Sequence, residues 1–255
     1  RDIGVTGVQT CALPIFCGDQ AGIDYEALLR IQPTHVLLQW GSRDLPPRLA
    51  ALAQRRGWTV QTLSLLSLEE VRRTARDLET AFAAWSLVSA TPQNTRPPSA
   101  ADRLEAALQP VEPSAARAAG RVLLLSGLSP PTALGPGSYH HQILVSLGGR
   151  PALTHGSAFM TLDLEDLIRL DPDTIILITD EQASPDATKA DAPRQALLPA
   201  RLHGLGLSAV RTGRVFAVSD PRALLPGTSL TAVAASMARA LRAAEFARPR
   251  SENRP

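Results

Sequence analysis

Two stretches of the chain carry the same order of polar and apolar positions. Residues 23–38 read IDYEALLRIQPTHVLL and residues 162–177 read LDLEDLIRLDPDTIIL, a constant separation of 139 residues. In each copy an Asp precedes a short helical pattern with a Glu in its first turn, a Pro stops the helix, and an apolar run follows. Unbroken apolar runs are typical of strands buried on both faces of a parallel sheet. The repeat therefore predicts two similar α/β lobes.

The remaining pattern supplies further elements of the same two lobes. Ser67 and Glu70 have the spacing of a capping box, which opens an amphipathic helix reaching about residue 88. Helices are also expected at 46–56, 100–108, 138–147, 194–203 and 229–244, and strands at 59–63, 121–126 and 215–218. We predict an α/β fold whose lobes each hold a mostly parallel sheet flanked by helices. The expected parts are an incomplete first lobe over 16–90, a helical connector over 91–119, a second lobe over 120–247 and a disordered tail over 248–255.

The first residues do not continue these patterns, and they contain no apolar core of a secretory signal. VTGVQTCALPI corresponds codon by codon to a common sequencing adapter. Residues 1–15 are therefore interpreted as a translated artefact, with native sequence expected from about Phe16. Without this segment Cys17 is the one cysteine, which excludes a disulfide framework and a cysteine-paired metal site.

Composition and charge exclude two classes of function. The chain has 26 Lys and Arg against 24 Asp and Glu, and its positive charge comes almost wholly from arginine, since Lys189 is the single lysine. The arginines are scattered among acids rather than clustered, which disfavours a nucleic-acid-binding face. No run of 18 apolar residues occurs, so the sequence offers no candidate membrane-spanning helix.

Candidate ligand residues follow the predicted strands, because ligands in open α/β sheets bind outside the carboxyl ends of the strands. In the first lobe these are Trp40, Ser42 and Arg43. Trp40 could stack on a flat macrocycle, and Arg43 could pair with a carboxylate or phosphate. The alternative interpretation is that Trp40 packs in the core and Ser42 caps the next helix.

In the second lobe the turn at 135–138 leads into a helix N-terminus, which suits an anionic group, although Ser138 as a simple cap is the alternative. Cleft candidates here are Tyr139, His140, Phe159, Met160, Glu181 and Arg222. Phe159 and Met160 could equally be core, and Arg222 a solvated loop residue. His140 and the adjacent His141 point about 100° apart on a helix, so no metal site made of protein ligands alone is expected. An axial histidine to haem or cobalt stays open.

In order and spacing these segments resemble the class III periplasmic solute-binding proteins of ABC importers, which carry cobalamin, ferric siderophores or haem. The resemblance lies in YEALLRIQPTHVLLQW and LEDLIRLDPDTIILITDE, in LVSLGGRPA and in GRVFAVSDPRALLPGTSL, and it covers residues 22–241. It implies an extracytoplasmic, periplasmic or lipid-anchored monomer that captures a metal chelate between two lobes, without catalysis or a resident cofactor. It also implies that Glu26 and Glu165 dock the permease dimer. Acids in a first helical turn are favourable in any case, which is the alternative explanation.

Three features depart from the family pattern. The family's first strand, helix and strand should precede Gly22, so the first lobe is expected to be truncated, with an exposed sheet edge. Thr34 stands where the second copy has Asp173, and Pro110 and Pro113 interrupt the helix that joins the lobes.

Two other functions stay open at this point. One is a two-lobed α/β enzyme such as a group transferase, although the sequence contains no GxSxG, HExxH, P-loop or Rossmann glycine motif. The other is a receptor for bare zinc or manganese, which would need at least three convergent histidines or carboxylates.

Overall fold

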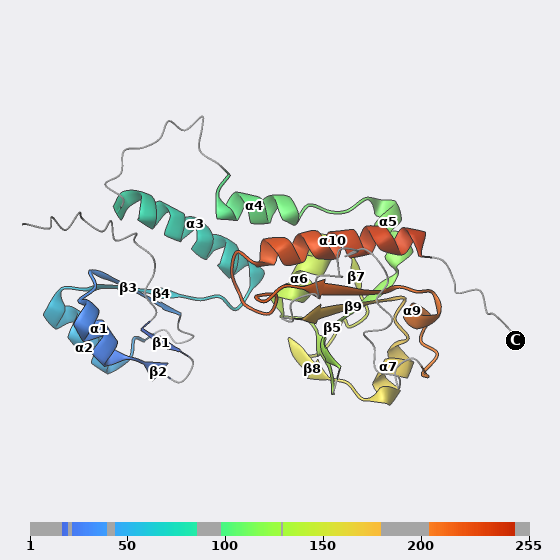
Figure 1. Cartoon of the computed structure of the whole chain (residues 1–255), viewed down its shortest axis with the longest axis horizontal. Helices are drawn as coiled ribbons and strands as arrows, with labels where there is room; N and C mark the ends of the chain where they lie inside the picture. Colours follow the sequence, from blue (N-terminus) through green and yellow to red (C-terminus); the bar gives the residue numbers. More distant parts are fainter. Residues whose placement is uncertain are drawn as a thin grey trace, which may run out of the picture. The chain divides into compact units, whose positions relative to one another are not determined.

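A computed structural model of the chain (Figure 1) describes residues 17–19, 22–39, 44–85, 98–128, 130–179 and 204–247. Contacts between residues divide the chain into two compact units, Arg1–Leu63 and Ser64–Pro255. The predicted helix at 194–203 and the tail at 248–255 lie outside the described residues, as does the segment 1–16. Four candidate ligand residues also lie outside them: Trp40, Ser42, Arg43 and Glu181.

The first unit is built around a parallel pair of strands. β3 (His35–Gln39) pairs with β4 (Thr59–Leu63), and α2 (Pro47–Arg56) lies between them in the chain. An antiparallel pair, β1 (Gly18–Asp19) and β2 (Gly22–Ile23), precedes α1 (Tyr25–Ile31). The buried core comes from both helices and from the residue directly before β4: Leu28, Leu49, Leu52, Ala53 and Trp58.

The second unit contains a mixed sheet whose three longest strands are parallel, as the repeat predicted. Its order is β10 (Val215–Ser219), β9 (Thr174–Thr179), β5 (Arg121–Leu128), β6 (Pro131–Leu134) and β8 (Phe159–Thr161). β7 (Arg150–Pro151) pairs with the start of β5. The sequence pattern did not predict β6 and β8, which run antiparallel to their neighbours.

Side chains of the central strands alternate between two apolar clusters, one on each face of the sheet. Leu124 and Ile176 belong to the cluster that includes α5 (Pro113–Ala119), α6 (Tyr139–Ser146) and α10 (Leu230–Phe246). Leu123 and Ile175, one position earlier, belong to the cluster that includes α7 (Leu164–Leu170) and α9 (Ser208–Arg211). Because successive side chains of a strand point to opposite faces, both faces of this sheet are covered. The prediction of strands buried on both faces is confirmed for β5 and β9.

The two copies of the repeat fold in the same way. Asp24 caps α1 by accepting the Ala27 N–H at 2.9 Å, and Asp163 caps α7 by accepting the Asp166 N–H at 2.7 Å. Both helices have seven residues, and each ends at a residue in the left-handed conformation directly before the proline: Gln32 (φ 51°) and Asp171 (φ 33°). These two are the only non-glycine residues with positive φ in the described part of the chain. The repeat is therefore structural as well as sequential.

The copies differ in the turn that leads from helix to strand. Asp173 accepts the backbone N–H of Arg121 at 2.7 Å and so ties the start of β9 to the start of β5. Thr34, at the equivalent place, interacts with the neighbouring His35 ring at 3.0 Å instead. In the described part of the first unit β3 pairs with β4 alone.

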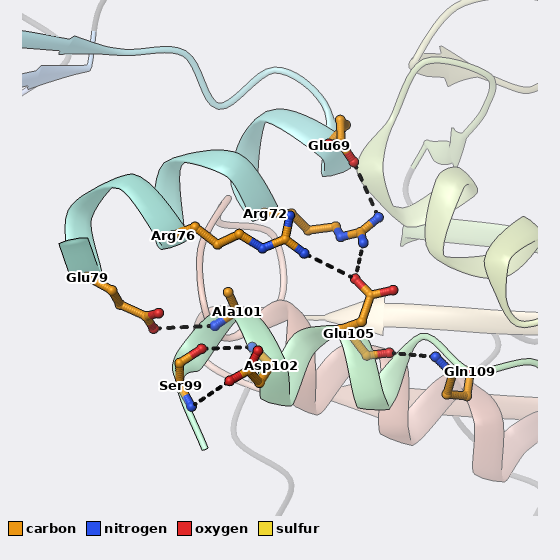
Figure 2. A network of polar contacts seen from close by, with 9 residues as sticks. All are labelled: Glu69, Arg72, Arg76, Glu79, Ser99, Ala101, Asp102, Glu105 and Gln109. Carbon is orange, nitrogen blue, oxygen red and sulfur yellow. Dashed lines mark hydrogen bonds and ion pairs between the residues drawn. The ribbon is translucent and has the colours of Figure 1, made fainter. Parts of the chain in front are cut away.

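The predicted connector is packed into the second unit. α3 (Leu68–Trp85) lies against α4 (Ala100–Ala107). Glu105 of α4 forms ion pairs with Arg72 and Arg76 of α3. Glu79 accepts the N–H groups of Ala100 at 2.6 Å and of Ala101 at 3.4 Å. Figure 2 shows the contact with Ala101 beside the Ser99–Asp102 capping box that begins α4. α3 and α4 both belong to the compact unit Ser64–Pro255, and the lobe boundary at residue 90 stays a prediction. As expected, the helical path is interrupted, because α4 ends at Ala107 and Pro113 begins α5.

Candidate functional site

The turn before α6 is shaped by local packing and by one cap. Ser138 accepts the His141 N–H at 3.1 Å and donates to the Gly135 carbonyl at 2.9 Å, so it serves as the N-cap. A Cβ at Gly135 would lie 2.6 Å from the Ser157 carbonyl oxygen, which explains the glycine at this close approach of two loops. The alternative interpretation of Ser138 as a helix cap therefore accounts for its contacts.

Tyr139 and His140 point into the second unit and hold the loop that follows β10. The Tyr139 hydroxyl donates to the Leu224 carbonyl, and His140 Nε2 lies 2.8 Å from the Ala223 carbonyl oxygen. His140 is fully buried, and its Nδ1 has no hydrogen-bond partner among the described residues. Since a carbonyl only accepts, the proton of the neutral ring belongs on Nε2. Contact with a ligand stays a prediction for both residues.

Burial sets the charge state of His140. It lowers the pKa of the imidazole to about 4, while the hydrogen bond to Ala223 acts in the opposite direction. The ring is therefore neutral at neutral pH. Burial also raises the pKa of the Tyr139 hydroxyl, so this side chain stays a hydrogen-bond donor.

Arg222 occupies the loop that these two residues hold. Its backbone N–H donates to Asp220 at 2.8 Å, and its carbonyl accepts the Ser229 hydroxyl at 3.1 Å. The side chain itself is exposed, and it has no ion pair among the described residues. The loop begins where β10 ends, at the carboxyl end of a parallel strand. An anchored backbone thus presents an exposed guanidinium at the end of the sheet where ligands of open α/β sheets bind.

Phe159 and Met160 lie at the other edge of the sheet. β8, which contains both, is the edge strand opposite β10, so the structure does not bring these residues together with the Arg222 loop. Phe159 is 57% exposed and pairs with Leu134. Met160 is partly buried and packs on the cluster beneath α7, which fits its alternative interpretation as a core residue.

Glu26 and Glu165 are exposed first-turn residues of α1 and α7. Neither carboxylate has an ion pair within the described residues; Arg169 pairs with Asp166 at 3.2 Å rather than with Glu165. Of the exposed apolar residues on these helices, Leu29 and Ile168 occupy the same position in the two copies, and the sequence pattern did not single them out. The signal available in the sequence is an aliphatic residue three positions after the glutamate in each copy.

The described residues contain neither a metal-type cluster of side chains nor a membrane-spanning helix. No three His, Cys, Asp or Glu side chains gather there as they would around a metal ion. None of the helices in that part of the chain is long and apolar enough to cross a membrane.

Solved structures share this architecture, although no protein-family model and no curated protein matches the sequence. A periplasmic haem-binding protein from Pseudomonas aeruginosa is 23% identical, with a TM-score of 0.57 over 92% of this chain and 80% of that one. The periplasmic vitamin B12-binding protein BtuF of Vibrio cholerae is 18% identical, with a TM-score of 0.56 over 88% of this chain and 79% of its own.

This chain has the fold of periplasmic solute-binding proteins. A third example is the siderophore-binding protein BauB, solved with two acinetobactin molecules and ferric iron. It is 15% identical, with a TM-score of 0.56 over 86% of this chain and 75% of that one. At these identities the likeness establishes the fold, as predicted from the repeat, and the function is argued from the residues below.

Proposed function

We propose that this chain is the solute-binding component of an ABC importer and captures a metal chelate between its two lobes. The observation behind this proposal is the repeat of one helix and one strand in the two compact units. The same capped seven-residue helix, left-handed stop and parallel strand occur once in each compact unit, in a chain with the fold of periplasmic solute-binding proteins. Receptors of this kind use one α/β unit on each side of the bound solute. An extracytoplasmic location is part of the proposal.

The solved neighbours support a metal chelate as the cargo. Their bound or named solutes are haem, vitamin B12 and a ferric siderophore complex, each a metal ion held by an organic ligand. Arg222 adds chemistry from this chain, because an exposed guanidinium on a fixed loop suits the carboxylates that haem and many siderophores carry. Trp40 and Arg43 would act from the first lobe, by stacking and by charge.

Glu26 and Glu165 are proposed to dock the two permease subunits. Each is an exposed carboxylate at the same position of its copy, without an ion pair in the described residues. Two equivalent acids can each engage an arginine of one subunit, and such pairs supply orientation as well as attraction. The first-turn position alone is worth about 0.3–1 kcal/mol of helix stability, so helix stabilisation and docking are separable only by experiment.

Titration of the full chain with hemin, cyanocobalamin and a ferric siderophore tests the proposal. We expect one of the three to bind saturably at one molecule per chain, with a shift of its visible absorption, and to be released unchanged. Failure of all three to bind, together with turnover of any substrate by the purified chain, would contradict it.

A further inference from the structure

The exposed faces of α1 and α7 carry the same three kinds of residue at matching positions. Glu26, Leu29 and Arg30 in the first copy match Glu165, Ile168 and Arg169 in the second. Positions i, i+3 and i+4 lie side by side on a helix, so each copy presents an acid, an aliphatic residue and an arginine on one face. We call these sets the first and second triads.

The aliphatic member of each triad is turned to solvent. Leu29 is 37% exposed and Ile168 is 52% exposed, whereas the preceding residues, Leu28 and Leu167, are buried and hold the helices in place. A single exposed aliphatic residue has no special meaning. Both copies carry an exposed aliphatic residue at the same spacing from an exposed glutamate. This is a second structural feature of the repeat, and one function shared by both copies would explain it.

The charges around the second triad indicate the chemistry of its partner. Asp163, Glu165 and Asp166 lie within the first turn of α7 or just before it, and Arg169 is the only arginine on that helix. Arg169 is already paired with Asp166, which leaves the Glu165 carboxylate to an external cation. A carboxylate beside an aliphatic side chain fits an arginine whose surroundings are apolar, because excluding water strengthens the ion pair.

We propose that Leu29 and Ile168 are contact residues for the permease and exclude water from the two glutamate–arginine pairs. This inference rests on the proposed function. It adds that each permease subunit presents a basic residue flanked by apolar side chains, one subunit for each triad. The docking surface is thus two equivalent triads rather than two isolated carboxylates.

Ile168→Thr in the full chain tests this, with Val145→Thr as the matched control. Val145 is also β-branched and helical, is 51% exposed, and lies on α6, which packs on the face of the sheet opposite to α7. Binding to the cognate permease–ATPase complex in lipid nanodiscs is measured over a series of salt concentrations. We expect Ile168→Thr to raise Kd about fivefold with an unchanged salt dependence, and Val145→Thr to stay within about twofold of the unaltered chain. Glu165→Gln should instead weaken the salt dependence.

Each other result has a definite meaning. If the unaltered chain binds the complex and Ile168→Thr binds as well as Val145→Thr does, the inference is wrong and the proposed function stands. If the unaltered chain does not bind the complex, both fail. If the chain self-associates in sedimentation and Ile168→Thr abolishes this without affecting permease binding, the partner of the second triad is a second copy of the chain. The inference is then overturned.

Discussion

His140 should make the second unit sensitive to pH between neutrality and pH 5. The buried imidazole has a pKa of about 4 in the folded chain against 6.5 for an ordinary histidine. As the pH falls below 6.5 the unfolded chain takes up a proton that the folded chain does not, so the stability contributed by the neutral ring is present above 6.5 and is lost toward about 4. Between pH 7.5 and 5.0 the loss is about 2 kcal/mol, from roughly 1.4 kcal/mol for each pH unit below the unfolded pKa.

The assay is thermal unfolding at these two pH values. A loss of that size lowers Tm by about 4–8 °C, at about 2–4 °C for each kcal/mol in a unit of this size. His140→Gln keeps an N–H donor for the Ala223 carbonyl but does not titrate, so this part of the fall in Tm should disappear. His155→Gln is the control, because His155 is exposed and should leave the fall unchanged. An equal fall in His140→Gln and in the unaltered chain would refute the reasoning.

Two further changes separate stability from binding. Glu70→Ala should lower Tm by about 4 °C, because Glu70 accepts hydrogen bonds from Ser64, Leu66 and Ser67 at 2.9–3.0 Å, whereas Glu69→Ala, in the same turn, should lower it by less than about 1 °C. An equal fall in Tm for the two variants would show that the charge near the helix N-terminus, rather than the hydrogen bonds of Glu70, supplies the stability. Arg222→Ala should weaken chelate binding about tenfold in titration and leave Tm within about 1 °C, since its side chain is exposed; a loss of Tm instead would give it a structural role.

Local capping was predictable from the sequence because the interactions span few residues. The side chains of Asp24 and Asp163 each accept the backbone N–H of the residue three positions later. Ser67 and Glu70 form a capping box, in which each side chain accepts the backbone N–H of the other residue. The buried parallel strands were also predictable, since an unbroken apolar run such as 175–178 fits few other environments.

The parts that escaped prediction depend on distant partners or on very short segments. β8 has three residues and pairs with β6, so its pattern is too short to read. α5 begins with Pro113, which the sequence analysis treats only as a helix breaker, although proline is favoured at a first helical position. The hydrogen bond between His140 and the Ala223 carbonyl joins residues that are 83 positions apart, so no local sequence pattern predicts it. The sequence alone therefore could not show that His140 holds the loop after β10.

Uptake of the bound chelate into proteoliposomes containing the cognate permease–ATPase complex tests the central claim most directly. The full chain should make uptake of its chelate dependent on ATP and on the chain itself. Glu26→Ala combined with Glu165→Ala should reduce uptake by more than about tenfold, and by more than either single change, while chelate affinity in titration stays within about twofold. Uptake that proceeds equally well without the chain, or with the double variant, would contradict the account.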